Sequence, residues 1–177
     1  MIAPSLALLT FFLHTALMDI FTLLQSKPVL IGLHLGAAII GIDLFLWLAG
    51  KFKDNTGSQR SRIITALLGV SAFIMSWISG GFYYVQYYGT LVKPIIKSGA
   101  ASWAHNISME TKEHIFLFII PLAMTVFFIT LLDKAKIDAL KIRRSAVWLS
   151  STVAVLGLLI GALGFTVSAA ARWGLMN

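Results

Sequence analysis

Residues 28–50 read PVLIGLHLGAAIIGIDLFLWLAG, and this stretch decides the fold of the chain. Its ionisable residues are His34 and Asp43, and it exceeds the roughly 20 apolar residues that cross a bilayer as a helix. Pro28 suits the first turn of such a helix, where a missing backbone N–H costs nothing. We therefore expect a membrane-spanning α-helix here.

Four further apolar blocks lie at 4–24, 63–84, 114–132 and 146–171, and none alternates with the period of two that marks a membrane β-strand. The 177-residue chain is 58% hydrophobic and 12% charged, which is too apolar for a soluble domain of this size. We expect the first block to be a retained helix, because it lacks the basic start of a signal peptide. The prediction is one all-α domain, 1–177, forming an integral membrane bundle of five transmembrane helices.

Basic residues gather in two connections of this bundle. Residues 51–62 hold four of the 14 Lys and Arg residues, and residues 133–145 hold five. Lys and Arg prefer the cytoplasmic side, so we expect the N-terminus inside, the C-terminus outside and a location in the bacterial inner membrane. Residues 89–113 then form a long external loop. This topology explains the net charge of +7 and leaves no basic face for nucleic acid.

Ionisable side chains within spans are costly in hydrocarbon and are therefore functional candidates. His34 is the most informative, since Ala37 and Gly41 share its helix face and leave room for a flat ligand such as a porphyrin. Close helix packing by small residues, with His34 hydrogen-bonded to a neighbouring helix, explains the same pattern. The other candidates within the spans are His14, Asp19, Asp43 and, at a helix start, His114.

A second polar group precedes the block at 114–132. Glu110 and His114 lie four residues apart, so on a helix the carboxylate can orient the imidazole. We expect the helices at 28–50 and 114–132 to be neighbours, which would gather a copper- or zinc-type ligand set in the outer third of the membrane. That set is His34, His105, Glu110 and His114.

The external segment adds Lys93 and Lys97, which can pair with the propionates of a porphyrin or with anionic lipid head groups. The chain has no Cys, which excludes thiolate metal sites and covalently attached haem. It also lacks the motifs of nucleophilic catalysis and of phosphate-binding loops.

Residues 34–43, HLGAAIIGID, resemble the second-helix pattern of small bacterial haem-b-type membrane proteins and of the copper-resistance CopD-like family. In two-haem relatives of this kind, pairs of histidines on facing helices hold the haems. No helix of this chain carries two histidines at haem-ligand spacing. The resemblance therefore implies one haem b near the outer face, ligated by His34 and His114, for electron transfer or redox sensing.

Two other classes of function stay open. A transporter or metal-handling protein would line a path with Asp19, His34 and Asp43. A non-catalytic membrane subunit would bind another protein or a second copy through small residues of the last block. These recur at spacings of three and four and include Gly157, Gly161 and Gly164, although packing inside the bundle explains them more simply.

Overall fold

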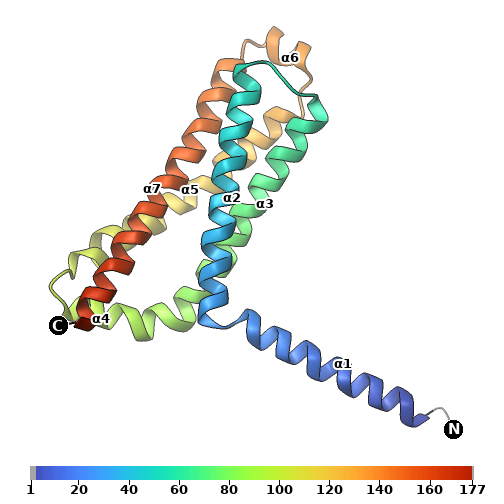
Figure 1. The fold of residues 1–177 in the computed structure, drawn as a ribbon. Helices are drawn as coiled ribbons and strands as arrows, with labels where there is room; N and C mark the ends of the chain where they lie inside the picture. The colour runs from blue at the N-terminus through green and yellow to red at the C-terminus, as the bar shows by residue number, and fades with distance from the viewer. Residues whose placement is uncertain (1–2, 177) are drawn as a thin grey trace.

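The computed structural model describes residues 3–176, with side chains from residue 8 onward, and this part of the chain is helical almost throughout (Figure 1). The described residues contain no strand, so the all-α prediction is confirmed. The elements are α1 (Ala3–Leu24), α2 (Lys27–Lys53), α3 (Gln59–Tyr83), the π-helix η1 (Tyr84–Val92), α4 (Lys93–Ser98), the π-helix η2 (Ala104–Met109), α5 (Glu110–Thr130), α6 (Lys134–Ala139) and α7 (Arg143–Met176).

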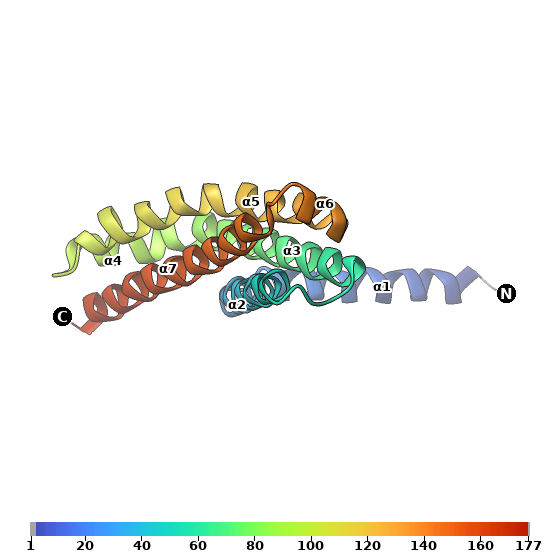
Figure 2. The same ribbon diagram turned by 90° about the horizontal axis from the view of Figure 1, so that it is seen from above.

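Four helical segments are long and apolar enough to cross a membrane. They are α2, α3 continued through η1 and α4, η2 joined to α5, and α7, and they match four of the five predicted spans. Both α3 and α7 contact α2 and also contact α5, so α2 and α5 lie diagonally across the bundle. Figure 2 shows α2 and α5 on opposite sides. The expectation that these two helices are direct neighbours is therefore wrong. Hydropathy identifies the spans but does not show which of them are in contact.

The middle of the bundle is an apolar layer. The rings of Phe45 of α2 and Phe73 of α3 lie tilted to one another with centroids 5.7 Å apart, and the fully buried Ile119 of α5 belongs to the same core. Small residues let the helices approach closely: a Cβ added at Gly157 would lie 2.7 Å from Ile42 Cγ1. Side-chain packing therefore closes the centre of the bundle.

The two basic connections lie at the same end of the bundle, which we call the basic end (residues 51–62 and 133–145). At this end the Gln59 side chain donates a hydrogen bond of 2.8 Å to the carbonyl of Leu131, which caps α5, so the first connection is held to the end of α5. The opposite end, here the aromatic end (residues 83–113), carries η1, α4 and η2. Figure 1 shows α6 at one end and α4 with the C-terminus at the other.

Helix α1 lies apart from the bundle. It turns away before the start of α2, near Gln25, and projects outward with its described side chains exposed on all sides (Figure 1). Residues 8–24 contain one Ala and no Gly. In lipid, helices associate through close packing of small residues rather than through burial of apolar surface. Residues 8–24 thus offer little Ala or Gly surface for such packing, and α1 makes almost no contact with α2.

The segment 89–113, predicted as an external loop, is corrected to a mostly helical one. The π-helix η1 continues α3, α4 follows with Pro94 in its first turn, and η2 leads into α5. Tyr88 and Ile96 pack here against Val167 of α7 in a second small core. A π-helix forms i→i+5 hydrogen bonds, so its side chains do not follow the 3.6-residue pattern by which α-helices are recognised.

Candidate functional site

His34 lies where all four helices of the bundle meet, towards the aromatic end. Its Nδ1 is 2.8 Å from the Ser76 carbonyl oxygen and 3.0 Å from Ser76 Oγ, and Ser76 Oγ donates to the His34 carbonyl at 2.9 Å. A carbonyl oxygen only accepts hydrogen bonds, so Nδ1 is assigned the proton and Nε2 carries a free lone pair. Helices α2 and α3 thereby fix both the tautomer and the ring orientation.

The lone pair on Nε2 faces the ammonium of Lys112, with 3.4 Å between Nζ and Nε2. Lys112 belongs to α5, so this contact crosses the bundle diagonal. The backbones of the other two helices, α3 and α7, approach this contact closely at glycine residues. A Cβ added at Gly80 of α3 would lie 2.5 Å from His34 Nδ1, and one at Gly164 of α7 would lie 3.4 Å from Lys112 Nζ. We call this contact the His34–Lys112 pair.

Among the described residues the ammonium of Lys112 forms no salt bridge, and the carboxylate whose charge acts on it is that of Glu113, the next residue of α5. The salt bridges among the described residues, Lys136–Asp133 and Arg143–Asp138, both lie at the basic end. One positive charge is therefore held within the bundle by a neutral base, an arrangement that can accept or release a proton. Sequence reasoning missed Lys112 because it counted this residue only among the basic residues on the outer side of the membrane. The helix begins at Glu110, which puts Lys112 inside it.

His114, the predicted second haem ligand, faces away from this pair. It is exposed, and its Nδ1–H donates to the Glu110 carbonyl of its own helix at 2.6 Å. Two residues along an α-helix correspond to a rotation of about 200°. Because Lys112 reaches His34, His114 must point to the opposite side of α5. The structure therefore pairs His34 with Lys112 and does not bring His34 and His114 together.

His105 lies in η2, where it is 4% exposed, and its Nδ1 is 2.9 Å from the hydroxyl of Tyr88 in η1. Tyr84 stacks on Tyr88 with ring centroids 5.2 Å apart. The two π-helices thus face one another through the Tyr88–His105 hydrogen bond. Segments of π-helix are frequent at functional sites.

The predicted metal ligands do not gather. His34, His105 and His114 each have a different partner, and the part of the chain that the structure describes holds no group of three or more His, Asp or Glu side chains placed to bind a metal ion. The geometry also does not fit a haem clamped by His34 and His114, because Lys112 faces one imidazole and the other points outward. Lys93 is half-buried and Lys97 exposed, both in α4 at the aromatic end.

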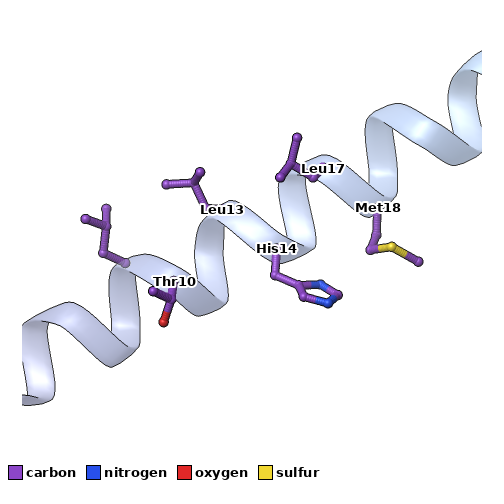
Figure 3. Close-up of a pocket in the computed structure, with 6 residues that line it drawn as sticks. Thr10, Leu13, His14, Leu17 and Met18 are labelled. Carbon is purple, nitrogen blue, oxygen red and sulfur yellow. The ribbon is translucent and has the colours of Figure 1, made fainter.

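The remaining polar candidates lie outside the bundle interior. Figure 3 shows His14 and Met18 extending from α1, in a shallow depression lined by α1 residues alone. Asp19 is exposed on the same helix, and Asp43 is exposed on α2. Nine residues along a helix give a rotation of about 180°, so Asp43 faces opposite to His34. The path through Asp19, His34 and Asp43 is not formed.

Two of the three glycines considered for partner binding are used inside the bundle. Gly157 is buried against Ile42, and Gly164 lies beside Lys112, whereas the space beside Gly161 is open.

Comparisons with models of protein families, with curated proteins and with solved structures found no match to this chain. The function is therefore inferred from the chemistry of the bundle itself.

Tyr88→Phe is expected to lower the free energy of unfolding by about 1–3 kcal/mol, because it leaves Nδ1 of the buried His105 without its partner. The matched control is Tyr87→Phe. Its hydroxyl donates to the Gln25 carbonyl at 3.0 Å in an exposed position, and its loss should cost no more than about 0.5 kcal/mol. Thermal unfolding in one detergent measures both variants. Equal losses of unfolding free energy in the two variants would show that the buried Tyr88–His105 hydrogen bond stabilises the protein no more than the exposed Tyr87 hydrogen bond does.

Proposed function

We propose that this chain is a multi-pass protein of the bacterial inner membrane that binds and releases a proton at the His34–Lys112 pair. The observation that carries the proposal is the 3.4 Å contact between Lys112 Nζ and His34 Nε2 across the bundle. Ionisable side chains that face a bundle interior typically mark proton relays and ion paths. The proposal replaces the haem implied by the sequence resemblance.

The proton cycle uses the two nitrogens of the pair. In the resting state Lys112 carries the positive charge and donates a hydrogen bond to His34 Nε2. A proton that arrives at Nε2 ends this hydrogen bond and leaves two cations facing one another in surroundings of low dielectric, where they repel strongly. Repulsion separates α2 and α5 locally, and the close contacts at Gly80 and Gly164 transmit the movement to α3 and α7. Release of the proton restores the hydrogen bond.

The packing supports access to the pair from the aromatic end. Glu113 is exposed and follows Lys112 directly in α5, and its carboxylate can exchange protons between water and this end of the bundle. Towards the basic end lies the apolar layer that contains Phe45 and Phe73. The buried hydroxyls beyond it, Thr65, Thr130 and Ser150, each donate to a backbone carbonyl of their own helix. The arrangement suits an outward-facing proton-binding state rather than an open channel.

The proposal includes a topology in which the basic end faces the cytoplasm and the C-terminus lies outside. In this topology α1 is the fifth span, with the N-terminus in the cytoplasm. The excess of Lys and Arg at the basic end supports the orientation, and the apolar side chains around α1 suit contact with lipid.

Single introduced cysteines test this topology, because the chain contains no Cys of its own. Thr56→Cys lies at the basic end and Ala100→Cys at the aromatic end, and both positions are exposed. In intact spheroplasts, a membrane-impermeant maleimide is expected to label Ala100→Cys at once and Thr56→Cys only after lysis. The reverse pattern would invert the proposed orientation.

The proton-binding role predicts a pH-dependent opening beside the pair. Ser79 lies one turn after Ser76 on α3 and is 5% exposed. The labelling rate of Ser79→Cys is divided by that of the exposed Ala100→Cys, which cancels the pH dependence of thiol reactivity. This ratio is expected to rise about ten-fold on acidification through the range where imidazoles gain a proton.

The same ratio is expected to stay flat with pH when Lys112→Met is added, since His34 protonation then creates no like-charge contact. A flat ratio in the parent protein, or an equal rise in both backgrounds, would contradict the proton-binding role. A Soret absorption band in the purified protein that disappears in His34→Ala would instead support the single-haem hypothesis.

A further inference from the structure

A second candidate binding site lies at the basic end, away from the His34–Lys112 pair. An open depression of about 540 Å³ is lined by residues of α6 and α7, by Lys141 in the connection between them and by Lys53 at the end of α2. Its apolar side consists of Ile137, Val147 and Trp148. Its rim carries Asp138 and four cationic side chains, Lys53, Lys141, Arg143 and Arg144. The size falls within the range of small-molecule sites.

One of the four cations is already engaged. Arg143 forms an ion pair with Asp138, and the side-chain oxygen of Asn55 is placed to accept hydrogen bonds of 3.1 Å from the Arg143 guanidinium. Lys53, Lys141 and Arg144 are exposed, and within residues 8–176 none of their side chains has a hydrogen bond or ion pair. Three positive charges thus surround the depression without compensation, and they favour an anionic ligand.

The backbone places one of these cations in an unusual conformation. Lys141 follows the C-cap of α6 with φ of 56°, in the left-handed region. Glycine is the usual residue at this position of a helix end, because a Cβ is unfavourable there. The chain instead carries a long cationic side chain at this position on the rim of the depression.

The apolar side of the depression continues along the outer surface of the bundle. Trp148 is 63% exposed, and Val155, seven residues further along α7 and on the same face, is 59% exposed. Trp is typical of the membrane–water interface. A free phosphate compound has no apolar group to place on this face, whereas the acyl chains of a lipid can pack against it.

We propose that this depression binds the phosphate head group of an anionic phospholipid of the cytoplasmic leaflet, with the acyl chains along Trp148 and Val155. Lys53, Lys141 and Arg144 contact the phosphate, while Arg143 stays with Asp138 and holds α6 against α7. Basic pockets between helices on the cytoplasmic side are a common mode of recognition of anionic lipids. The site is independent of proton binding at His34.

The test measures lipid binding to the delipidated full-length protein by native mass spectrometry. The probes are phosphatidylglycerol, phosphatidylcholine with the same acyl chains, and inorganic phosphate. Phosphatidylglycerol is expected to bind more tightly than phosphatidylcholine. The double variant Lys141→Gln/Arg144→Gln is expected to weaken phosphatidylglycerol binding about thirty-fold, because each cation at a membrane surface contributes a factor of about five.

The matched control is Arg60→Gln/Lys136→Gln, which removes the same charge from the basic end outside the depression and should change binding less than about two-fold. Equal losses in the two double variants would overturn the site in favour of general attraction to a basic surface. Displacement of the lipid by millimolar inorganic phosphate would assign the depression to a free anion. The melting temperature of the parent protein gives a second readout, because phosphatidylglycerol should raise it and phosphatidylcholine should not. An equal effect of the two lipids would also overturn the proposal.

Discussion

His34→Leu is expected to lower the free energy of unfolding by about 3 kcal/mol, because it leaves the Lys112 ammonium within the bundle without a partner. The double variant His34→Leu/Lys112→Met should recover most of this loss. An apolar pair of similar volume often stabilises a protein as well as the buried charged group that it replaces. The single variant Lys112→Met should cost less, since it leaves a neutral imidazole nitrogen unpaired rather than a charge.

Denaturant unfolding of the three variants and the parent protein forms a double-mutant cycle. His114→Leu serves as the control, because His114 is exposed on the opposite side of α5 and its loss should change stability by no more than about 0.5 kcal/mol. Additive losses in the double variant would show that His34 and Lys112 do not interact.

Gly157→Leu is expected to destabilise the bundle by about 3 kcal/mol or to prevent folding, because α2 and α7 have no space for a side chain at this point. The Cβ alone would lie 2.7 Å from Ile42 Cγ1 and 3.6 Å from Phe73, and Leu adds three more carbon atoms. Both neighbours are buried in the apolar layer, so they cannot move aside cheaply. Gly157→Ala gives a milder form of the same change and should cost about 1–2 kcal/mol.

Gly161→Leu is the matched control, one turn further along the same helix. No heavy atom lies within 4 Å of a Cβ added there, so the variant should match or slightly exceed the parent protein in stability. Unfolding followed by circular dichroism compares the variants. Comparable losses at the two positions would contradict the α2–α7 contact. Dissociation of an oligomer in Gly161→Leu alone would favour partner binding through this face.

Much of the fold could be predicted from hydropathy. Long apolar stretches such as 28–50 cannot remain in water, and the four packed segments follow directly from that constraint. Three features could not be read in this way. The π-helical Tyr84–Val92 has a different side-chain period. Residues 8–24 of α1 are apolar enough for a span yet lie outside the bundle, and the diagonal placement of α2 and α5 depends on contacts between helices.

The candidate site was only partly predictable for the same reason. His34 stands out as an imidazole in an apolar helix, and one explanation of its pattern, a hydrogen bond to a neighbouring helix, agrees with its contact to Ser76. Its partner across the bundle depends on how α5 is rotated about its own axis. Lys112 and His114 lie two residues apart and therefore face opposite sides of α5, and the sequence does not show which of them faces inward. Because a buried charge is costly, the imidazole was the expected inward residue.

The most direct test of the central claim is ¹⁵N NMR of the His34 imidazole in histidine-labelled protein, assigned with His34→Gln. At neutral pH we expect a neutral ring with the proton on Nδ1 and an unprotonated Nε2 that accepts a hydrogen bond, and this hydrogen-bond signature should disappear in Lys112→Met. On acidification Nε2 should gain a proton. A ring protonated on Nε2 at neutral pH, an iron-bound imidazole, or a spectrum unchanged by Lys112→Met would contradict the His34–Lys112 pair as the proton-binding site.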